Sequence, residues 1–308
     1  MNFQQLRIVR ETARQNFNLT EVANALHTSQ SGVSKHIKDL EDELGLELYL
    51  RKGKRLLGLT EPGREMLKVV ERMLLDASNI KNLADQYSQQ DTGQLTIATT
   101  HTQARYVLPK IVTVFKKQFP KVHLKLHQGS PKEIAQMLLE GEADIGLATE
   151  ALADRDALAT FALYQWHHEV VVPNGHPLID VNPLTLEAIA EHPIITYHEG
   201  FTGRFTLDKT FSDAGLSPDI VMSALDADVI KSYVELGLGV GIVASIAYSP
   251  ERDTGLKMLN CAHLFTENQA KLAIRKGHLL RQYAYRFIEI CSPELSRAKV
   301  IAAAAEAI

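Results

Sequence analysis

The chain has little cysteine and no long apolar run. Its 308 residues include only Cys261 and Cys291, without a Cys-x-x-Cys pair or Cys/His ligand spacing, so neither a disulfide framework nor a structural zinc is expected. No stretch approaches the roughly 18 uninterrupted apolar residues of a membrane span. No positively charged segment leads into an apolar run at the N-terminus. We therefore expect a cytoplasmic protein with no membrane partner.

Catalytic signatures are also missing. The sequence contains neither Gly-x-Ser-x-Gly nor His-Glu-x-x-His, and its 12 histidines are scattered without the spacing of a triad. The glycines between residues 237 and 241 end a helical pattern and lead into a strand, whereas a dinucleotide motif follows a strand and opens a helix. We therefore predict no catalytic residue, no metal and no cofactor.

The net charge of −4 is unevenly distributed along the chain. Residues 1–60 carry 9 Lys and Arg against 7 Asp and Glu, and the remaining residues carry 24 against 30. With 45% hydrophobic and 23% charged residues, the composition is that of an ordinary globular protein long enough for two or three domains. The negative total therefore does not exclude DNA binding by the N-terminal part.

Two helices that meet across a short turn are predicted between residues 19 and 44. Their apolar faces contain Val22, Ala23 and Leu26 in the first helix and Val33, Ile37, Leu40 and Leu44 in the second. Ala23 is small where the helices would cross, and Thr28 or Ser29 can cap the second helix. This pattern predicts a helix-turn-helix. An amphipathic first helix with Phe3, Leu6, Val9 and Ala13 would pack behind it.

Polar side chains of the second helix are predicted to read DNA. The face opposite the apolar one carries Gln30, Ser31, Ser34, Lys35 and Lys38, which can contact base edges and phosphates in a major groove. The following basic hairpin, with Arg51, Lys52, Lys54 and Arg55 around Gly53, would hold the phosphate backbone as a wing. A solvated helix face and an ordinary surface loop are the alternatives. The agreement of apolar spacing, short turn and basic hairpin favours DNA.

A long helix is predicted from residue 61 to residue 90, after a winged domain that ends near Leu59. Thr60 can cap this helix, and Pro62 is tolerated in its first turn. Apolar residues recur at heptad spacing, at Met66, Val70, Met73, Ala77, Ile80, Ala84 and Tyr87. A second copy of the helix would cover this stripe and make a dimer, and docking onto its own chain is the alternative.

Strand and helix patterns alternate from residue 91 onward. Strands are predicted at residues 95–99, 122–127, 143–149, 170–172, 194–197, 220–221, 240–244 and 271–274, and helices at 105–119, 131–140, 203–213, 227–236 and 281–290. This alternation predicts two similar α/β lobes with mainly parallel sheets. The expected organisation is an all-α winged helix-turn-helix domain (1–59), a linker helix (60–90) and an α/β domain (91–308). Within the last, lobe I covers about 91–163 and 267–308, and lobe II about 164–266.

Hydroxyl and amide side chains gather where these strands give way to helices. The candidates are Thr100, Thr102 and Gln103 after the first strand, Ser130 after the second, Thr149 at the end of the third and Thr202 at a helix start in the other lobe. Open α/β sheets bind ligands at the carboxyl ends of their strands, and helix N-termini favour anions. A small anion between the lobes is therefore expected. For any single residue, an ordinary helix cap explains the pattern equally well.

Several segments of the chain resemble a known family. Residues 28–34, 40–45 and 59–63 are similar to the DNA-binding domain and linker helix of LysR-type transcriptional regulators, and the resemblance extends over essentially the whole chain. It implies a two-lobed effector domain like that of periplasmic binding proteins. Residues 98–106, 127–131, 200–204 and 226–231 resemble the sulfur-assimilation members CysB and Cbl. The N-terminal residues, the wing tip and residues 166–168 are closer to Cbl, while Phe201 is closer to CysB.

This resemblance implies partners and effectors. The partners would be double-stranded DNA, a second copy in a homodimer that assembles into a homotetramer, and RNA polymerase. The protein would activate genes for cysteine synthesis or for use of sulfate and organosulfur compounds. Its effector would be sulfate, thiosulfate, O-acetylserine or N-acetylserine, or adenosine phosphosulfate. The six candidate residues of the cleft match positions that line the effector cleft of those relatives.

Two other classes of function stay open. A repressor, or a regulator of another metabolic pathway, would have the same architecture. An enzyme or a solute-binding protein could be built on the two-lobed part, although the missing catalytic constellation and the missing export signal count against them.

Overall fold

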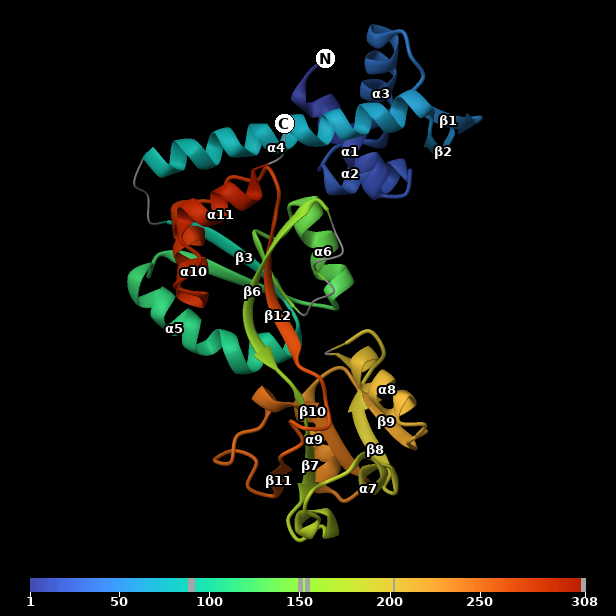
Figure 1. The fold of residues 1–308 in the computed structure, drawn as a ribbon. Coiled ribbons are helices and arrows are strands. Elements are labelled where there is room, and N and C mark those ends of the chain that lie inside the picture. Colours follow the sequence, from blue (N-terminus) through green and yellow to red (C-terminus); the bar gives the residue numbers. More distant parts are fainter. Residues whose placement is uncertain (88–91, 149–151, 153–155, 202, 306–308) are drawn as a thin grey trace. The chain divides into compact units, whose positions relative to one another are not determined.

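The computed structural model describes residues 1–87, 92–148, 152, 156–201 and 203–305 (Figure 1). The chain divides into two compact units, Met1–Ser88 and Gln89–Ile308, and each is described by itself. None of the helices in the described residues is both long and apolar enough to cross a membrane.

The first unit is a winged helix-turn-helix followed by a long helix. Its elements are α1 (Phe3–Arg14), α2 (Leu19–Ala25), α3 (Gln30–Leu44), β1 (Tyr49–Lys52), β2 (Arg55–Leu59) and α4 (Glu61–Tyr87). Ser29 caps α3 by accepting a hydrogen bond from the Gly32 amide at 3.1 Å. Ala23, which is 4% exposed, is buried in the core that α2 and α3 share. The predicted helix-turn-helix is therefore confirmed.

Two residues that were predicted to pack lie outside the core. Phe3 is 51% exposed and Leu44 is 38% exposed. Each stands at a helix end, where the helix reaches past the elements that cover its apolar face. The wing is an antiparallel hairpin in which Lys52 pairs with Arg55. It turns at Gly53, as predicted, because this residue adopts a φ of 62° that side chains disfavour.

The predicted stripe of α4 divides into two parts. Val70 is 1% exposed and packs with Met66 in the core of its own unit, so the alternative of docking onto the same chain is correct for these positions. Exposed apolar side chains remain along another line of the helix, at Val69, Met73, Ile80 and Leu83. Ala84 is also exposed, and the Tyr87 side chain lies outside the described ones. The exposed line keeps heptad spacing, as expected for a helix that meets a partner.

The second unit consists of two lobes, each with a five-stranded sheet (Figure 1). Lobe I has the strand order β4 (Val122–Gln128), β3 (Gly93–Thr99), β5 (Ile145–Ala148), β12 (Asn268–Arg275) and β6 (Leu158–Trp166). Its helices are α5 (Leu108–Gln118), α6 (Pro131–Glu140), α10 (Gln282–Cys291) and α11 (Arg297–Ala304), and a π-helical turn spans Gln103–Val107. The helix α6 covers one face of the sheet, and α5 and α10 cover the other.

Lobe II repeats this plan. Its strand order is β11 (Leu256–Leu259), β7 (His168–Pro173), β10 (Val240–Ala244), β8 (Ile194–Tyr197) and β9 (Ile220–Ala224). The helices are α7 (Leu186–Ala190), α8 (Arg204–Asp213) and α9 (Ala227–Glu235), with 3-10 turns at Pro177–Asp180 and Ser245–Ala247. Buried residues of α7 and α8 pack in one hydrophobic cluster and those of α9 in another. Both lobes are therefore sheets covered by helices on both faces.

The prediction of mainly parallel sheets is correct for only three strands of each sheet. The strands β3, β4 and β5, and likewise β8, β9 and β10, are parallel, whereas β6, β7, β11 and β12 pair antiparallel. The reason is that β12 and β7 belong to segments that enter one lobe from the other, so they run against the strands they join. The predicted strands and helices are present, and β6, β11, α7 and α11 are additional.

The exposed line of α4 yields a prediction about assembly. An aspartate in place of Ile80 would bury an unpaired charge wherever this line meets a partner, so the dissociation constant of the dimer should rise about tenfold or more. Ser78→Asp, at an exposed position on another side of the same helix, is the matched control. Analytical ultracentrifugation measures both variants. A dimer of unchanged stability in Ile80→Asp would exclude this line as the interface.

Candidate functional site

The exposed face of α3 carries the side chains that were predicted to read DNA. Gln30, Ser31, Ser34, Lys35 and Lys38 are all exposed. Val33, Ile37 and Leu40, at 0–2% exposure, fix the opposite face in the core. The polar face therefore cannot turn inward without unpacking the domain. Its amide, hydroxyls and cations are available to a duplex.

The four cations of the wing are exposed but differ in their partners. The Arg51 guanidinium bonds to Glu41 Oε2, and the other oxygen of that carboxylate accepts hydrogen bonds from the Leu48 and Tyr49 amides at 2.8 and 3.3 Å. This contact ties the wing to α3. It also pairs the charge of Arg51. Sequence reasoning missed this role of Glu41. Lys52, Lys54 and Arg55 remain the candidates for contact with phosphates.

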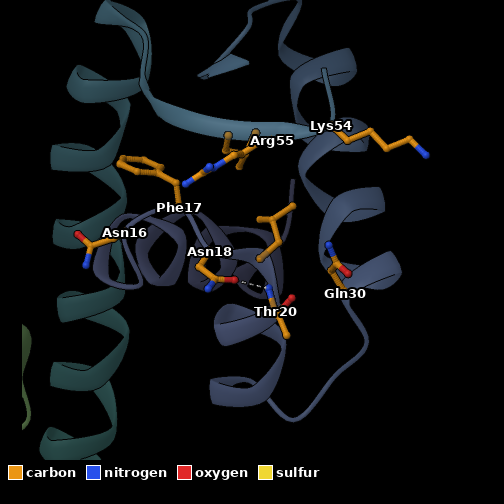
Figure 2. A pocket seen from close by; sticks show the side chains of 9 residues that line it. Asn16, Phe17, Asn18, Thr20, Gln30, Lys54 and Arg55 are labelled. Carbon is orange, nitrogen blue, oxygen red and sulfur yellow. Dashed lines mark hydrogen bonds between the residues drawn. The ribbon is translucent and has the colours of Figure 1, made fainter. Parts of the chain in front are cut away.

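A hollow of about 390 Å³ lies between the wing and the segment that leads into α2 (Figure 2). Gln30, Thr20 and Lys54 border it from α3, α2 and the wing, and Arg55 extends into it on the side of Phe17. Lys54 points away from the domain. The hollow thus brings groups from three elements to one side of the unit. Thr20 was not among the predicted residues because it belongs to the helix that precedes the reading helix.

The predicted effector residues that the structure describes lie at one edge of the lobe I sheet. The strands β3, β4 and β5 are parallel, so their carboxyl ends meet. The Thr100 amide donates to Leu147 O at 3.2 Å, and the Gly129 amide donates to Thr99 O at 3.1 Å. This edge carries Thr100, Thr102 and Gln103. The other predicted residues of the cleft, Thr149 and Thr202, lie outside the described residues.

Three of the predicted side chains are buried. Thr100, Thr102 and Gln103 are 3%, 2% and 3% exposed. Thr102 Oγ1 lies near the Tyr197 hydroxyl but makes no hydrogen bond of ordinary geometry within the described residues. Gln103 Oε1 accepts a hydrogen bond from the Tyr164 hydroxyl. Such buried polar groups need partners, so Thr102 has capacity for a ligand.

Two further buried side chains on the crossing strands have unpaired polar atoms within the described residues. Trp166, at the end of β6, pairs with Asn268, at the start of β12, and they are 3% and 1% exposed. Trp166 Nε1 and Asn268 Oδ1 have no hydrogen-bond partner in the part of the chain that the structure describes. The indole nitrogen can donate a hydrogen bond, and the amide oxygen can accept one. No local motif signals them, because the two residues are about a hundred positions apart in the sequence.

Gly203 brings lobe II against these groups. It has a φ of 68°, and a Cβ at this position would lie 2.8 Å from Asn268 Oδ1 and 3.2 Å from the Trp166 ring. Only glycine fits so close an approach. The loop before α8 therefore closes over the two crossing strands, on the side where their polar atoms are unpaired.

Ser130 is engaged in another way. Its hydroxyl donates to Glu133 Oε2 at 2.8 Å and accepts from the Glu133 amide at 3.3 Å, in a capping box for α6. The Ser130 backbone amide also donates to Glu133 Oε2, at 2.7 Å, and this bond, together with the one from the hydroxyl, holds the pKa of the Glu133 carboxyl below its usual range. An ionised carboxylate beside the hydroxyl repels a second anion. The geometry therefore favours the helix cap over direct contact with an anionic effector.

Comparison with known proteins gives a consistent result. The chain matches the family described as bacterial regulatory helix-turn-helix protein, lysR family, over residues 3–64, and the LysR substrate binding domain over residues 88–296. It is similar to the HTH-type transcriptional regulator SsuR of Burkholderia cenocepacia, with 59% identity over 308 residues and 100% of both chains covered.

Two further similarities concern Cbl. The HTH-type transcriptional regulator cbl of Escherichia coli is 54% identical over 296 residues, covering 96% of this chain and 94% of that protein. The crystal structure of the cofactor-binding domain of the Cbl transcriptional regulator superposes with a TM-score of 0.68 at 48% identity. It covers 70% of this chain and 95% of that chain.

The wing tip should control the salt dependence of DNA binding. Lys54→Gln removes one cation per chain, so the slope of log affinity against log salt should become shallower by about 0.9 per chain on any duplex. Lys68→Gln on α4, where the cation is paired with Glu65, is the control. Fluorescence anisotropy between about 50 and 200 mM salt measures the slope. Equal slopes for wild type and Lys54→Gln would exclude a phosphate contact at the wing tip.

Gln30, in contrast, should affect sequence preference. A bidentate contact between a glutamine and a base discriminates by about 1–3 kcal/mol, so Gln30→Ala should bring the affinities for cognate and base-substituted duplexes closer together. Its salt slope should stay that of the wild type, because no charge is lost. Competition binding against a panel of single-base variants measures the preference. An unchanged ranking would assign base reading to other residues of α3.

Proposed function

This chain belongs to the LysR-type family of transcriptional regulators, and from this premise we propose that it controls genes of sulfur assimilation or organosulfur use. Membership of the family makes it a DNA-binding regulator and not an enzyme. Support for the sulfur pathway comes from the segments 98–106, 127–131, 200–204 and 226–231, which resemble CysB and Cbl. The resemblance favours an activator, and a repressor would use the same architecture.

The observation that carries the proposed regulation is a set of unpaired buried groups near contacts between the lobes. Thr102 Oγ1 and Trp166 Nε1 are donors without partners in the described residues, and Thr100 lies at the same sheet edge. An unsatisfied buried polar group costs about 1–3 kcal/mol, so a ligand that accepts these hydrogen bonds is favoured. No charged side chain is among these groups. We infer a small anion: sulfate, thiosulfate, an acetylserine or adenosine phosphosulfate.

The ligand would be held by both lobes. Thr100, Thr102 and Gln103 come from lobe I, while Gly203 comes from lobe II. A ligand that contacts both sides stabilises one angle between the lobes over others, and only such a preference can alter regulation. The unpaired Asn268 Oδ1 favours an effector that also carries a donor group.

Assembly and location follow from the same proposal. The exposed line of α4 would pair two copies, and a second contact between effector domains would give the homotetramer. Two reading helices related by a two-fold axis require operator half-sites with the same symmetry. The protein would act in the cytoplasm, on double-stranded DNA and together with RNA polymerase.

Binding of the effector can be tested at Thr102. A hydrogen bond to a charged group contributes about 1.5–3 kcal/mol, so Thr102→Val should weaken anion binding about tenfold or more. Trp166→Phe removes the indole donor and should act in the same direction. Isothermal titration calorimetry with the proposed anions measures both effects. Thr113→Val, on the exposed surface of α5, is the matched control and should bind as the wild type does.

Two outcomes would contradict this assignment. If none of the anions binds the wild type, the effector belongs to another chemical class. If an anion binds equally well to the wild type, Thr102→Val and Trp166→Phe, it occupies a different site.

A further inference from the structure

Close in sequence to the predicted effector residue Gln103, lobe I and lobe II are joined by contacts to one carboxylate. Asp228 lies in the first turn of α9 in lobe II. Its Oδ1 accepts a hydrogen bond from the Tyr106 hydroxyl at 2.7 Å, and its Oδ2 accepts one from Arg105 Nε at 3.0 Å. Both donors belong to the π-helical turn of lobe I. A single side chain therefore connects the two lobes through two hydrogen bonds.

The Tyr106 ring is also held by lobe II. Lys231 Nζ lies 5.2 Å from the ring centroid, and the ring packs on the hydrophobic cluster that contains Ile230. Lys231 is 6% exposed and is fixed by the Ala247 carbonyl at 2.8 Å and by Asp253 at 2.9 Å. The cation that faces the ring is thus part of the rigid interior of lobe II.

Opposite charges keep Asp228 ionised. Partial burial acts to raise the pKa of this carboxyl, but the Tyr106 hydrogen bond and the charges of Lys231 and Arg105 outweigh it and lower the pKa. His101 Nε2 lies 3.7 Å from Asp228 and 4.0 Å from Asp226. These three side chains have ligand atoms within 4.8 Å of one another, as a metal site would require. Because Arg105 and Lys231 already neutralise the Asp228 carboxylate, we interpret this cluster as a contact between the lobes and not as a metal site.

We propose that Asp228 is a positioning residue that latches lobe II to the effector-binding turn of lobe I and thereby sets the affinity of the cleft. This proposal rests on the proposed function. The same turn carries Gln103 at the cleft and Arg105 and Tyr106 at the latch, so a change at one end moves the other. A ligand held by both lobes gains from a lobe angle that is already fixed, because it does not have to supply the ordering itself.

The angle between the lobes can be measured without any ligand. Spin labels at Lys117→Cys in lobe I and Glu187→Cys in lobe II report the distance between exposed sites on α5 and α7, helices that carry no latch residue. Burial raises the pKa of the native Cys261 and Cys291 thiols to about 12, so the labels react selectively with the introduced cysteines. Labelled chains are diluted with unlabelled full-length protein, so that distances within one chain dominate the dipolar signal.

Asp228→Asn is the informative substitution. It keeps the shape of the side chain but removes the negative charge that Arg105 and Tyr106 contact. The Asp228 side chain is 39% exposed, so the substitution does not disturb a packed core. Asp213→Asn is the matched control, because it removes a carboxylate of lobe II whose partner, Lys209, lies on the same helix. Tyr106→Phe removes only the hydroxyl and leaves the ring over Lys231.

We expect one narrow distance distribution in the wild type and in Asp213→Asn, and a broader one in Asp228→Asn. The affinity for the anion that binds the wild type should fall about three- to tenfold in Asp228→Asn, a range that allows for the partial exposure of the pair. Tyr106→Phe should act in the same direction, and the double variant should lose little more than Asp228→Asn alone. Melting temperatures within a few degrees of wild type would separate this effect from unfolding.

An unchanged distance distribution in Asp228→Asn would overturn the latch. A broadened distribution with unchanged affinity would overturn its role in setting the affinity. If none of the proposed anions binds the wild type, the proposed effector fails. The ligand-free distance measurement still decides whether Asp228 holds the lobes together.

Discussion

The pairing of β6 with β12 is the constraint on which the C-terminal unit depends. These two antiparallel strands complete the sheet of lobe I, and in the part of the chain that the structure describes they also lead to and from lobe II. Their register places Trp166 opposite Asn268 at the end where the lobes meet. A slip of β6 by one residue would turn Trp166 to the other face of the sheet, away from Asn268. Part of the candidate site and the connections between the lobes therefore lie on the same two strands.

Local sequence was sufficient for those parts of the molecule whose structure is decided locally. The helix-turn-helix follows from helical periodicity and one capping serine, and Thr100 to Gln103 stand out because a strand gives way to a helix there. Trp166, Asn268 and Asp228 could not be recognised in this way, since their roles depend on strand register and on contacts between distant segments. The long strand β6 was missed because polar residues interrupt its apolar pattern. The antiparallel direction of β7 and β12 was missed, although both were predicted as strands, because the return of the chain from one lobe to the other leaves no local signal.

Side chains also acquired roles that residue type alone does not indicate. Arg51 belongs to the basic run, yet its charge is paired with Glu41 and holds the wing. Ser130 stands at the predicted edge, yet its hydroxyl is used by a helix cap. In the first half of α4, Val70 and Leu74 face the winged domain while Val69 and Met73 remain exposed, and the exposed line continues to Ile80 and Leu83. One helix can thus serve two interfaces, and the position of the reading helix is tied to the pairing of two copies.

Within five residues, the π-helical turn from Gln103 to Val107 carries one residue of the candidate effector site and two residues that contact lobe II. An α-helix advances about 100° per residue, so removing one residue from this turn would rotate everything after it by that angle. Exchanging a side chain at Thr102 or Gln103 has no such consequence, because the backbone phase of Arg105 and Tyr106 is retained. Point substitutions at these two positions can therefore change which ligand a protein of this architecture binds. An insertion or deletion in the same turn would instead separate ligand binding at Gln103 from the contact between the lobes at Arg105 and Tyr106.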